Sequence, residues 1–421
     1  MGGRQSLARI GLALLVGGAI ATEASGQAFG GRDVERGVTV PTRPRPEFDP
    51  LGVRLGGFRL DAALQAGVGW DSNVFGRRGN QVSDGYATQR LDASLNSLWS
   101  THALGFSADL EARQQFSRSE LDWTDWSIGG FGRYDFSVDT SVRAEYRHYR
   151  AHLDVYDFDV QRAGVFRPVP YDSDEISVSG TTRLNRIGLL AIGTYRTFRF
   201  EDVGGQGPFS RVSTNDFDTV IGALGTSYFF APGRAANLVV RLQDISYRDS
   251  IARGRDSFTW EALAGLQYDF DGVWQARLSI GWRERDYRAP QFRNLSGPAV
   301  EGSLTWAPTL ITTLRLAVAS TIEESIRQDS VGYRRYNGSL TIDHELLRNV
   351  ILTGQARLER REYERPTQTV TDGVLTLGAN WLINRNLALI GSYSHYNRLS
   401  ASGGISEWDR NLLQVRLRIA L

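Results

Sequence analysis

Hydrophobic and polar side chains alternate along most of this chain with a period of two residues. In the segment 273–287, Trp274 and Trp282 fall on one face, whereas Arg277 and Arg283 fall on the other. Successive side chains of a β-strand point to opposite faces, so each such segment predicts a strand with one apolar and one polar face. The chain also ends inside a segment of this kind.

Alternating segments recur from about Phe58 to the C-terminus, at intervals of roughly 20 residues, which is the spacing of strand, turn, strand and loop in an outer-membrane barrel. The predicted fold is all-β: a transmembrane, antiparallel, up-and-down β-barrel of about 18 strands, with 16 also compatible. The expected strands are 58–72, 86–99, 103–116, 125–138, 141–151, 173–186, 187–200, 215–230, 236–249, 256–271, 273–287, 297–307, 312–325, 332–345, 349–362, 371–384, 386–398 and 407–421.

The connections between these strands alternate in length. Tight connections carry turn residues, as in Ala231-Pro232-Gly233, Asp271-Gly272, Ala307-Pro308 and Asn384-Arg385-Asn386. Longer connections at 73–85, 152–172, 201–214 and 399–406 fall on the other side. In bacterial barrels the short turns face the periplasm, so both termini are expected there. The longest loop, about 152–172, could form either a constriction or a surface lid.

Aromatic residues indicate which face of the strands meets lipid. Trp260 and Phe270 share a face, and their separation projects to roughly 25 Å along a tilted barrel, the height of the apolar outer band. Tryptophans near strand ends predict two aromatic girdles. The periplasmic girdle is Trp99, Trp274, Trp306 and Trp381, and the outer girdle is Trp70, Trp126, Trp282 and Trp408.

The N-terminal region predicts secretion. Residues 1–26 combine Arg4 and Arg9 with a short apolar stretch and small residues, as in a signal peptide. Residues 27–57 are expected to be a Pro-rich periplasmic arm, and 58–421 the outer-membrane barrel, with no second domain. The chain has no cysteine, which excludes disulfides and acylation of a cysteine, and its net charge of +1 argues against a nucleic-acid partner.

With the apolar face outward, the polar face lines the lumen. All 48 basic residues are arginines, whose guanidinium stays charged and suits carboxylates and sugar hydroxyls. Such a wall can be structural, with opposite charges paired across neighbouring strands, or a weakly binding track for a polyhydroxylated, acidic polymer. The predicted lumen-lining transport residues are Arg113, Arg147, Arg277, Arg283, Arg285, Arg315, Arg357, Arg361, Asp109, Glu111 and Glu359.

The sequence predicts neither an enzyme nor a metal site, and no cofactor is expected. Ser394 and His395 are neighbours, but adjacent residues of a strand point to opposite faces and cannot form a catalytic dyad directly. His344-Glu345 begins like a zinc-protease motif, but the second histidine of that motif does not follow.

Two short stretches resemble the opening of the β-barrel porin 2 family, which includes exopolysaccharide-export barrels. They are LGVRLGGF at 51–58 and VGWDSNVF at 68–75, preceded by the Pro-rich arm. The resemblance implies a barrel in the bacterial cell outer membrane that serves capsule or exopolysaccharide export, with a periplasmic polysaccharide-export lipoprotein as partner. The chain departs from expectation at Leu421, where barrel-assembly signals usually end in an aromatic residue.

The end of the second motif and the last strand are candidates for specific roles. Asp71, Ser72 and Asn73 could bind a cation or sugar at the outer rim, or could bond their own backbone to start the following loop. The last strand is expected to pair with the one that begins near Phe58, with Arg416 and Arg418 in the lumen. Its predicted lipid face and signal for the barrel-assembly machinery is Leu413, Val415, Leu417, Ile419 and Leu421.

The expected function is a conduit for export of an exopolysaccharide or capsular polysaccharide. The alternative is a passive diffusion porin for small sugars or anions, and a third class is a structural or adhesin barrel with a closed lumen. Loop closure separates the first two, because a diffusion porin usually folds a long loop into the lumen and a polymer exporter needs a wider or openable bore.

Overall fold

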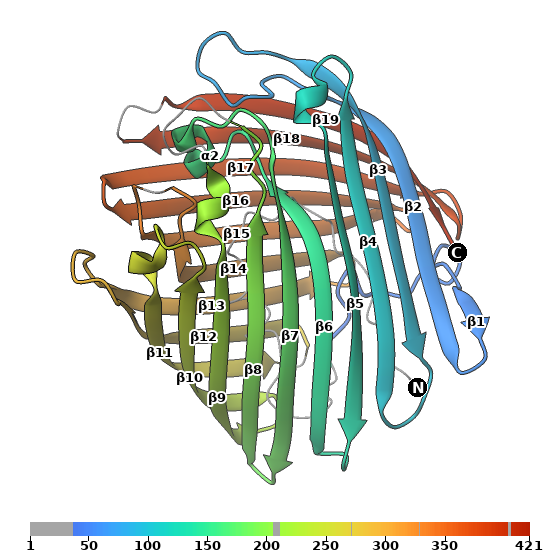
Figure 1. Ribbon diagram of the computed structural model, residues 1–421. Coiled ribbons are helices and arrows are strands. Elements are labelled where there is room, and N and C mark those ends of the chain that lie inside the picture. Colours follow the sequence, from blue (N-terminus) through green and yellow to red (C-terminus); the bar gives the residue numbers. More distant parts are fainter. Residues whose placement is uncertain (1–36, 205–210, 271, 328, 403–405) are drawn as a thin grey trace.

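The computed structural model describes residues 37–204, 211–270, 272–327, 329–402 and 406–421. Within them, 18 antiparallel strands, β2 to β19, form a closed barrel in which each strand pairs with its sequence neighbours and β19 returns to β2 (Figure 1). This confirms the predicted all-β, up-and-down fold. One additional short strand, β1, pairs with the start of β2. The predicted signal peptide, 1–26, lies outside the described residues.

The strands follow the predicted segments closely, because each has a lipid side and a water side. Their bounds are β1 Val53–Leu55, β2 Phe58–Asp71, β3 Asp84–Ser97, β4 Ala103–Gln115, β5 Trp123–Asp135, β6 Thr140–Leu153, β7 Val169–Leu184, β8 Ile187–Phe200, β9 Phe217–Ala231, β10 Arg234–Tyr247, β11 Ser257–Phe270, β12 Trp274–Tyr287, β13 Leu295–Thr309, β14 Thr312–Glu324, β15 Gly332–Leu347, β16 Val350–Glu364, β17 Thr367–Leu382, β18 Leu387–Ala401 and β19 Trp408–Ala420. Four short helices join them: α2 Phe158–Ala163, and the 3-10 helices η1 Ser119–Leu121, η2 Val212–Asn215 and η3 Arg253–Arg255.

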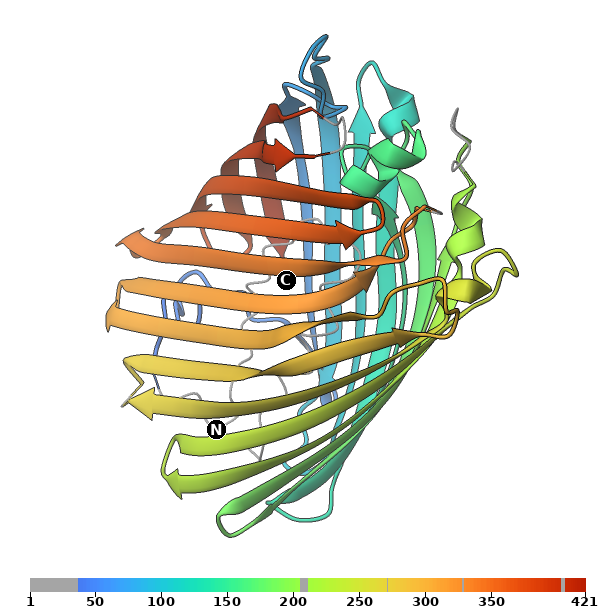
Figure 2. The same ribbon diagram turned by 90° about the vertical axis from the view of Figure 1, so that its left-hand side faces the viewer.

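The two ends of the barrel differ in the length of their connections. The helices gather at one end, here called the long-loop end, and tight turns join the strands at the other, the short-turn end (Figure 2). The turn predicted at Ala307-Pro308 is wrong, because β13 continues to Thr309 and the chain reverses at residues 310–311. Proline cannot donate a ladder hydrogen bond, and the pairing is irregular between Trp306 and Thr309 instead.

The exposed side chains on the outer face of the strands are mostly apolar, as contact with lipid requires, and the side chains on the inner face are mostly polar. On β12, Ile280 is 59% exposed and Trp282 47%, whereas Arg283 is 9% exposed and Arg285 1%. A closed barrel pairs all its backbone groups between strands, so apolar side chains can face hydrocarbon while polar ones face the interior. The prediction that the apolar face points outward is therefore correct.

Tryptophan positions confirm most of the predicted girdles. Trp99, Trp274 and Trp381 are exposed on the outer surface at the short-turn end, and Trp274 stacks on Trp306 with ring centroids 4.7 Å apart. Trp408 was predicted in the outer girdle, and this is wrong. It is 7% exposed on the inward face of β19, where it contacts a loop described below.

Residues 37–50, the first part of the N-terminal arm that the structure describes, lie along the inner rim of the short-turn end. The backbone N–H of Val40 donates to Thr313 Oγ1 on β14 at 2.9 Å. The Arg45 guanidinium lies 2.6 Å from Glu345 Oε2 on β15, and both side chains are buried. These contacts attach the arm to one arc of the barrel wall rather than leaving it as a free linker.

No helix in the described residues is long and apolar enough to cross a membrane.

Candidate functional site

The loop between β6 and β7, residues 154–168, is called the inner loop because it enters the barrel. Asp157 caps the N-terminus of its helix α2, and the Asp157 carboxylate accepts from the backbone N–H of Asp159 at 2.9 Å. The helix ends at Gly164, which has a φ of 73° and a left-handed conformation that suits glycine. Local capping therefore fixes a short compact turn that can enter the lumen as a unit.

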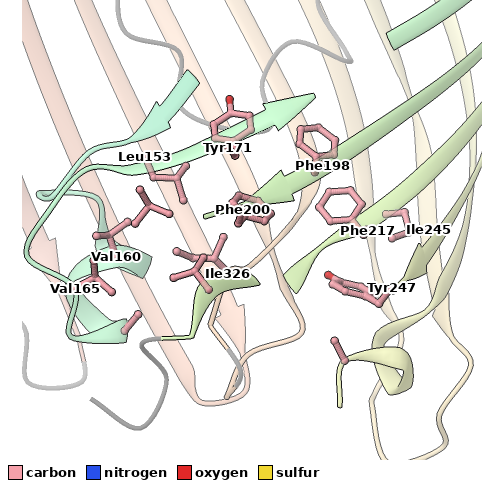
Figure 3. Packing of buried hydrophobic residues seen from close by; sticks show 14 residues of the cluster. Leu153, Val160, Val165, Tyr171, Phe198, Phe200, Phe217, Ile245, Tyr247 and Ile326 are labelled. Carbon is pink, nitrogen blue, oxygen red and sulfur yellow. The ribbon is translucent and has the colours of Figure 1, made fainter. Parts of the chain in front are cut away.

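One side of the inner loop packs against the wall from which it arises. Val160 and Val165 belong to a buried apolar cluster with Tyr171, Phe198 and Phe200 of β7 and β8 (Figure 3). This cluster lies at the long-loop end between the barrel wall and the loops. Its burial holds the apolar side of α2 on this wall.

The other side of the inner loop contacts β16 across the barrel. Arg361 Nη1 donates to Asp157 Oδ2 at 3.1 Å, and the Tyr363 hydroxyl donates to Asp159 Oδ1 at 2.8 Å. Glu359 Oε1 accepts from Arg361 Nε at 2.6 Å and holds that guanidinium in place. Since β7 and β16 are nine positions apart in a ring of 18 strands, the inner loop bridges opposite walls of the barrel.

A second connection, after β14, meets the inner loop. The Ser325 hydroxyl donates to Asp159 Oδ2 at 2.8 Å. Arg255 Nη1 donates to the carbonyls of Ser325, Arg327 and Ser330, at 3.0, 2.9 and 3.1 Å. The barrel mouth at the long-loop end is thus narrowed by two loops that hydrogen-bond to each other.

The predicted motif Asp71, Ser72 and Asn73 lies at the end of β2. It links the inner loop to the seam, which is the line along which β2 pairs with β19. Asp71 is fully buried, and both its carboxylate oxygens lie 2.9 Å from Arg410 Nε on β19. The Arg410 guanidinium in turn lies over the ring of Tyr156, 4.1 Å from its centroid. The motif therefore connects the first strand, the last strand and the loop that crosses the lumen.

Asn73 and Ser72 complete the same junction. Asn73 Nδ2 donates to the carbonyls of Arg77 and Asp409, both at 2.8 Å, and its backbone N–H donates to Asp71 Oδ1 at 3.0 Å. Ser72 Oγ accepts from the backbone N–H of Asn411 at 2.8 Å. These bonds agree with the interpretation of the motif as a local loop start, and they extend it across the seam.

Arg398 on β18 adds a further anchor for the inner loop. Its guanidinium donates to Gln161 Oε1 at 2.6 Å and to the Tyr156 carbonyl at 2.9 Å. The Arg398 guanidinium also lies over the ring of Trp408, 5.1 Å from its centroid. The inward position of Trp408 is therefore part of this anchor.

The buried carboxyls of the inner loop are shifted in opposite directions. Burial favours protonation of Asp154, but hydrogen bonds from the His152 ring and the Tyr156 hydroxyl outweigh it and lower the Asp154 pKa to about 2. Burial and the neighbouring charge of Asp157 raise the pKa of Asp159. One carboxyl of the loop is thus held firmly ionised, and the other is closer to protonation.

On the wall formed by β10 to β14, arginines and glutamates interlock. Arg241 lies 2.6 Å from Glu261 and also pairs with Glu301, Arg283 pairs with Glu261, and Arg285 pairs with Glu324. We call these residues the arginine–glutamate wall. Arg283 Nη1 also donates to the Ser320 carbonyl at 2.8 Å, and Arg285 Nε donates to Thr259 Oγ1 at 2.8 Å.

The other predicted lumen residues also lie on inward faces, but they do not form one cluster. Their contacts are Arg315 with Asp343 at 2.6 Å, Arg147 with Ser127 Oγ at 3.3 Å, Asp109 with the same hydroxyl at 3.1 Å, Arg90 with Glu111 at 3.5 Å, Arg277 with Gln267 at 3.3 Å, Arg113 over the Tyr86 ring at 4.2 Å, and Glu359 with Arg335 at 2.5 Å. Arg315, Glu111 and Glu359 thus have partners of opposite charge on neighbouring strands, as the structural interpretation of the wall expects, whereas Arg113, Arg147 and Asp109 contact an aromatic ring or a hydroxyl.

The last strand has the predicted orientation. Leu413, Val415, Leu417, Ile419 and Leu421 are 43–52% exposed on its outer face. The register with β2 runs from Leu412 opposite Asp71 to Ala420 opposite Ala63. Arg416 and Arg418 alternate with the exposed residues and face the lumen.

Sequence reasoning placed Arg361 and Glu359 in the lumen but missed Asp157, Asp159 and Arg410, which also hold the inner loop. Asp157 and Asp159 lie in a loop, where alternation carries no information. Arg410 lies on the inward face of β19, as Arg416 and Arg418 do. Continuing the two-residue alternation six residues back from Arg416 would therefore have placed Arg410 in the lumen.

Lumen arginines without a direct ion pair are expected to set ion selectivity. Arg357, Arg416 and Arg418 have no ion pair in the part of the chain that the structure describes. Replacing all three with glutamine should make the pore more selective for cations, because positive charge on the lumen wall favours anions. The reversal potential in a salt gradient measures this change.

The matched control is Arg360→Gln, since Arg360 pairs with Glu362 on the outer face of β16. It should leave the reversal potential unchanged, and equal shifts in the two variants would contradict the assignment. Arg283 and Arg285 are less suitable for this test, because their loss removes ion-pair partners from Glu261 and Glu324 inside the arginine–glutamate wall.

The residues weighed for catalysis lie apart. Ser394 Oγ hydrogen-bonds Thr376 Oγ1 at 2.9 Å, whereas the His395 ring bonds Asn411 Oδ1 at 2.9 Å on the opposite face. Among the described residues, no group of three or more His, Asp or Glu side chains is arranged to hold a metal ion.

Comparisons with solved structures give distant barrels. Vanillate-bound OpdK of Pseudomonas aeruginosa matches with 12% identity and a TM-score of 0.46, over 86% of this chain and 99% of that one. The ferric enterobactin receptor PfeA of the same organism and the siderophore receptor PirA of Acinetobacter baumannii match with 8% and 7% identity. Both have a TM-score of 0.46, over 86% of this chain and 80% of theirs. No curated protein matches the chain.

A family comparison covers nearly all of the described chain. The matched region, 45–421, includes the motif at the seam, the inner loop and all 18 barrel strands. The fold and this match place the protein among porin-like barrels of the outer membrane. The chain belongs to the family described as Putative beta-barrel porin 2.

Proposed function

We propose that this barrel is a passive diffusion channel for small polar solutes, such as sugars or small anions, across the outer membrane. The observation that carries the proposal is the inner loop, which bridges β7 and β16 and is held by Arg361, Tyr363 and Arg398. A long loop folded into the lumen is the device by which diffusion porins restrict solute size.

The chemistry of the lumen fits this role. Paired arginines and carboxylates present many hydrogen-bonding groups to water and solute while keeping net charge low. Each contact with a passing solute is then weak, which conduction requires. The long-loop end faces the cell exterior in this proposal, and the short-turn end with both termini faces the periplasm, as in other bacterial barrels.

Export of an exopolysaccharide, together with a periplasmic polysaccharide-export lipoprotein, is the second candidate. The resemblance of the stretches at 51–58 and 68–75 to a family that includes exopolysaccharide-export barrels supports it. The contacts that hold the inner loop are all hydrogen bonds, ion pairs and apolar packing, so a partner could displace the loop to widen the bore. Export thus requires an open state, whereas diffusion of small solutes does not.

Liposome swelling with sugars of graded size tests the proposal. Vesicles containing the full-length barrel should admit monosaccharides readily, and the rate should fall sharply for tri- and tetrasaccharides. Planar bilayers should show a steady single-channel conductance with the same protein. A barrel that gives no current and no swelling would contradict diffusion and would favour a channel that opens only with its partner.

A further inference from the structure

A cavity of about 110 Å³ opens from the lumen wall near the long-loop end. Strands β8 to β12 and β14 supply most of its lining, and Asn215, Ser325 and Ile326 from the loops cover it. At about 10–15 Å³ for each water position, it can hold on the order of eight waters or a ligand of one ring. It is distinct from the contacts that anchor the inner loop on β16 and β18.

Aromatic side chains form one side of this cavity. Phe198, Phe217 and Tyr247 lie on the adjacent strands β8, β9 and β10 and contact one another in sequence, with ring centroids 4.6 and 5.6 Å apart (Figure 3). Phe200 and Ile245 extend the same surface. We call these five residues the aromatic row. Phe198 and Phe217 stack on each other, and the Arg255 guanidinium lies 4.3 Å from the Tyr247 centroid, so the row supplies the aromatic part of the lining.

Charged and polar side chains form the rest of the lining. The lining includes three arginines of the arginine–glutamate wall and three glutamates, so the charges of the lining balance. Uncharged donors and acceptors complete it. The polar lining residues are Arg241, Arg283, Arg285, Glu261, Glu323, Glu324, Gln243, Thr259, Thr321, Asn215 and Ser325.

We infer that this cavity is a binding subsite for a neutral pyranose sugar. The apolar face of the ring would lie on the aromatic row, and its hydroxyls would reach guanidinium, carboxylate and amide groups of the lining. An anion would approach three glutamates, and a purely apolar ligand would make no hydrogen bonds with the polar lining residues. A ring with one apolar face and a polar edge matches a lining that contains both kinds of group.

The subsite rests on the proposed function only in that a solute must reach the lumen. Binding is measured without transport, by saturation-transfer NMR on the full-length barrel in detergent. The probes are methyl β-glucopyranoside, glucuronate and cyclohexanol. Strong saturation of the glucoside, and much weaker saturation of the other two, is expected. Equal saturation of all three, or none of the glucoside at millimolar concentrations, would overturn the assignment.

Variants locate the binding. Phe198→Ala and Phe217→Ala should weaken binding of the glucoside by about tenfold or more, because each removes a ring from the aromatic row. Phe131→Ala is the matched control, since Phe131 lies on β5, beneath the Arg143 guanidinium at 3.6 Å and away from the cavity. Where an alanine variant does not fold, Phe198→Leu keeps the bulk and removes the flat face. Binding unchanged by both row variants would refute the subsite.

The two proposals fail separately. A barrel that swells liposomes with glucose but shows no saturation of the glucoside would refute the subsite and leave diffusion intact. A barrel that binds the glucoside in detergent but gives no swelling would refute unassisted diffusion and leave the subsite intact.

Discussion

An Asp71→Asn barrel is expected to unfold at a clearly lower urea concentration than the parent, with a loss of about 3–5 kcal/mol in the free energy of unfolding. The amide keeps the shape of the side chain but removes its charge. Arg410, which is only 3% exposed, is then left buried without its counter-ion at the seam between β2 and β19. Urea titration in phospholipid vesicles, followed by tryptophan fluorescence, measures the effect.

Two further variants show that the ion pair causes this loss. Glu145→Gln removes a carboxylate from a pair with Arg143 that is about one third exposed, and it should cost no more than about 1 kcal/mol. Asp71→Asn combined with Arg410→Gln removes both charges and should recover part of the lost stability. Similar losses for Asp71→Asn and Glu145→Gln would show that the buried pair does not hold the seam.

Replacing α2 and its flanks, residues 157–164, by a short Gly-Ser linker should raise the single-channel conductance severalfold. The change removes the part of the inner loop that crosses to β16, and conductance rises with the cross-section at the narrowest point. Swelling rates should then lose their dependence on sugar size between mono- and tetrasaccharides. Planar-bilayer recording and liposome swelling measure the two effects on the same preparation.

A point substitution checks that docking of the inner loop, and not shortening of the chain, is responsible. Arg361→Gln removes the buried partner of Asp157 and should give frequent transitions to a larger conductance. Arg288→Gln is the matched control, because Arg288 is exposed at the same end and pairs with Asp244 and Asp256 outside the inner loop. A stable parental conductance in Arg361→Gln would mean that the loop does not limit the bore.

The barrel was predictable from sequence because each strand separates two solvents. Alternation in 273–287 predicted β12 and showed which of its faces meets lipid and which meets the lumen. The same rule placed Arg416 and Arg418 on the lumen face of β19. Every second residue of a barrel strand faces lipid, so each strand can be predicted from its own short segment of sequence.

The path of the inner loop could not be predicted in this way. Asp157 and Arg361 are 204 residues apart, and no local pattern indicates that they meet. The position of Trp408 could not be predicted either, because an aromatic residue at a strand end can belong to a girdle or can contact a loop inside the barrel. The seam motif was recognised, but its partner Arg410 emerged only from the pairing of the first and last strands.

The junction at Asp71 also implies an order of events during biogenesis. The inner loop contacts Arg398 of β18 and Arg410 of β19, and these two strands follow the other barrel strands in the chain. Arg410 is oriented by Asp71 only once β19 has joined β2. The inner loop therefore gains its full set of contacts only once the cylinder has closed.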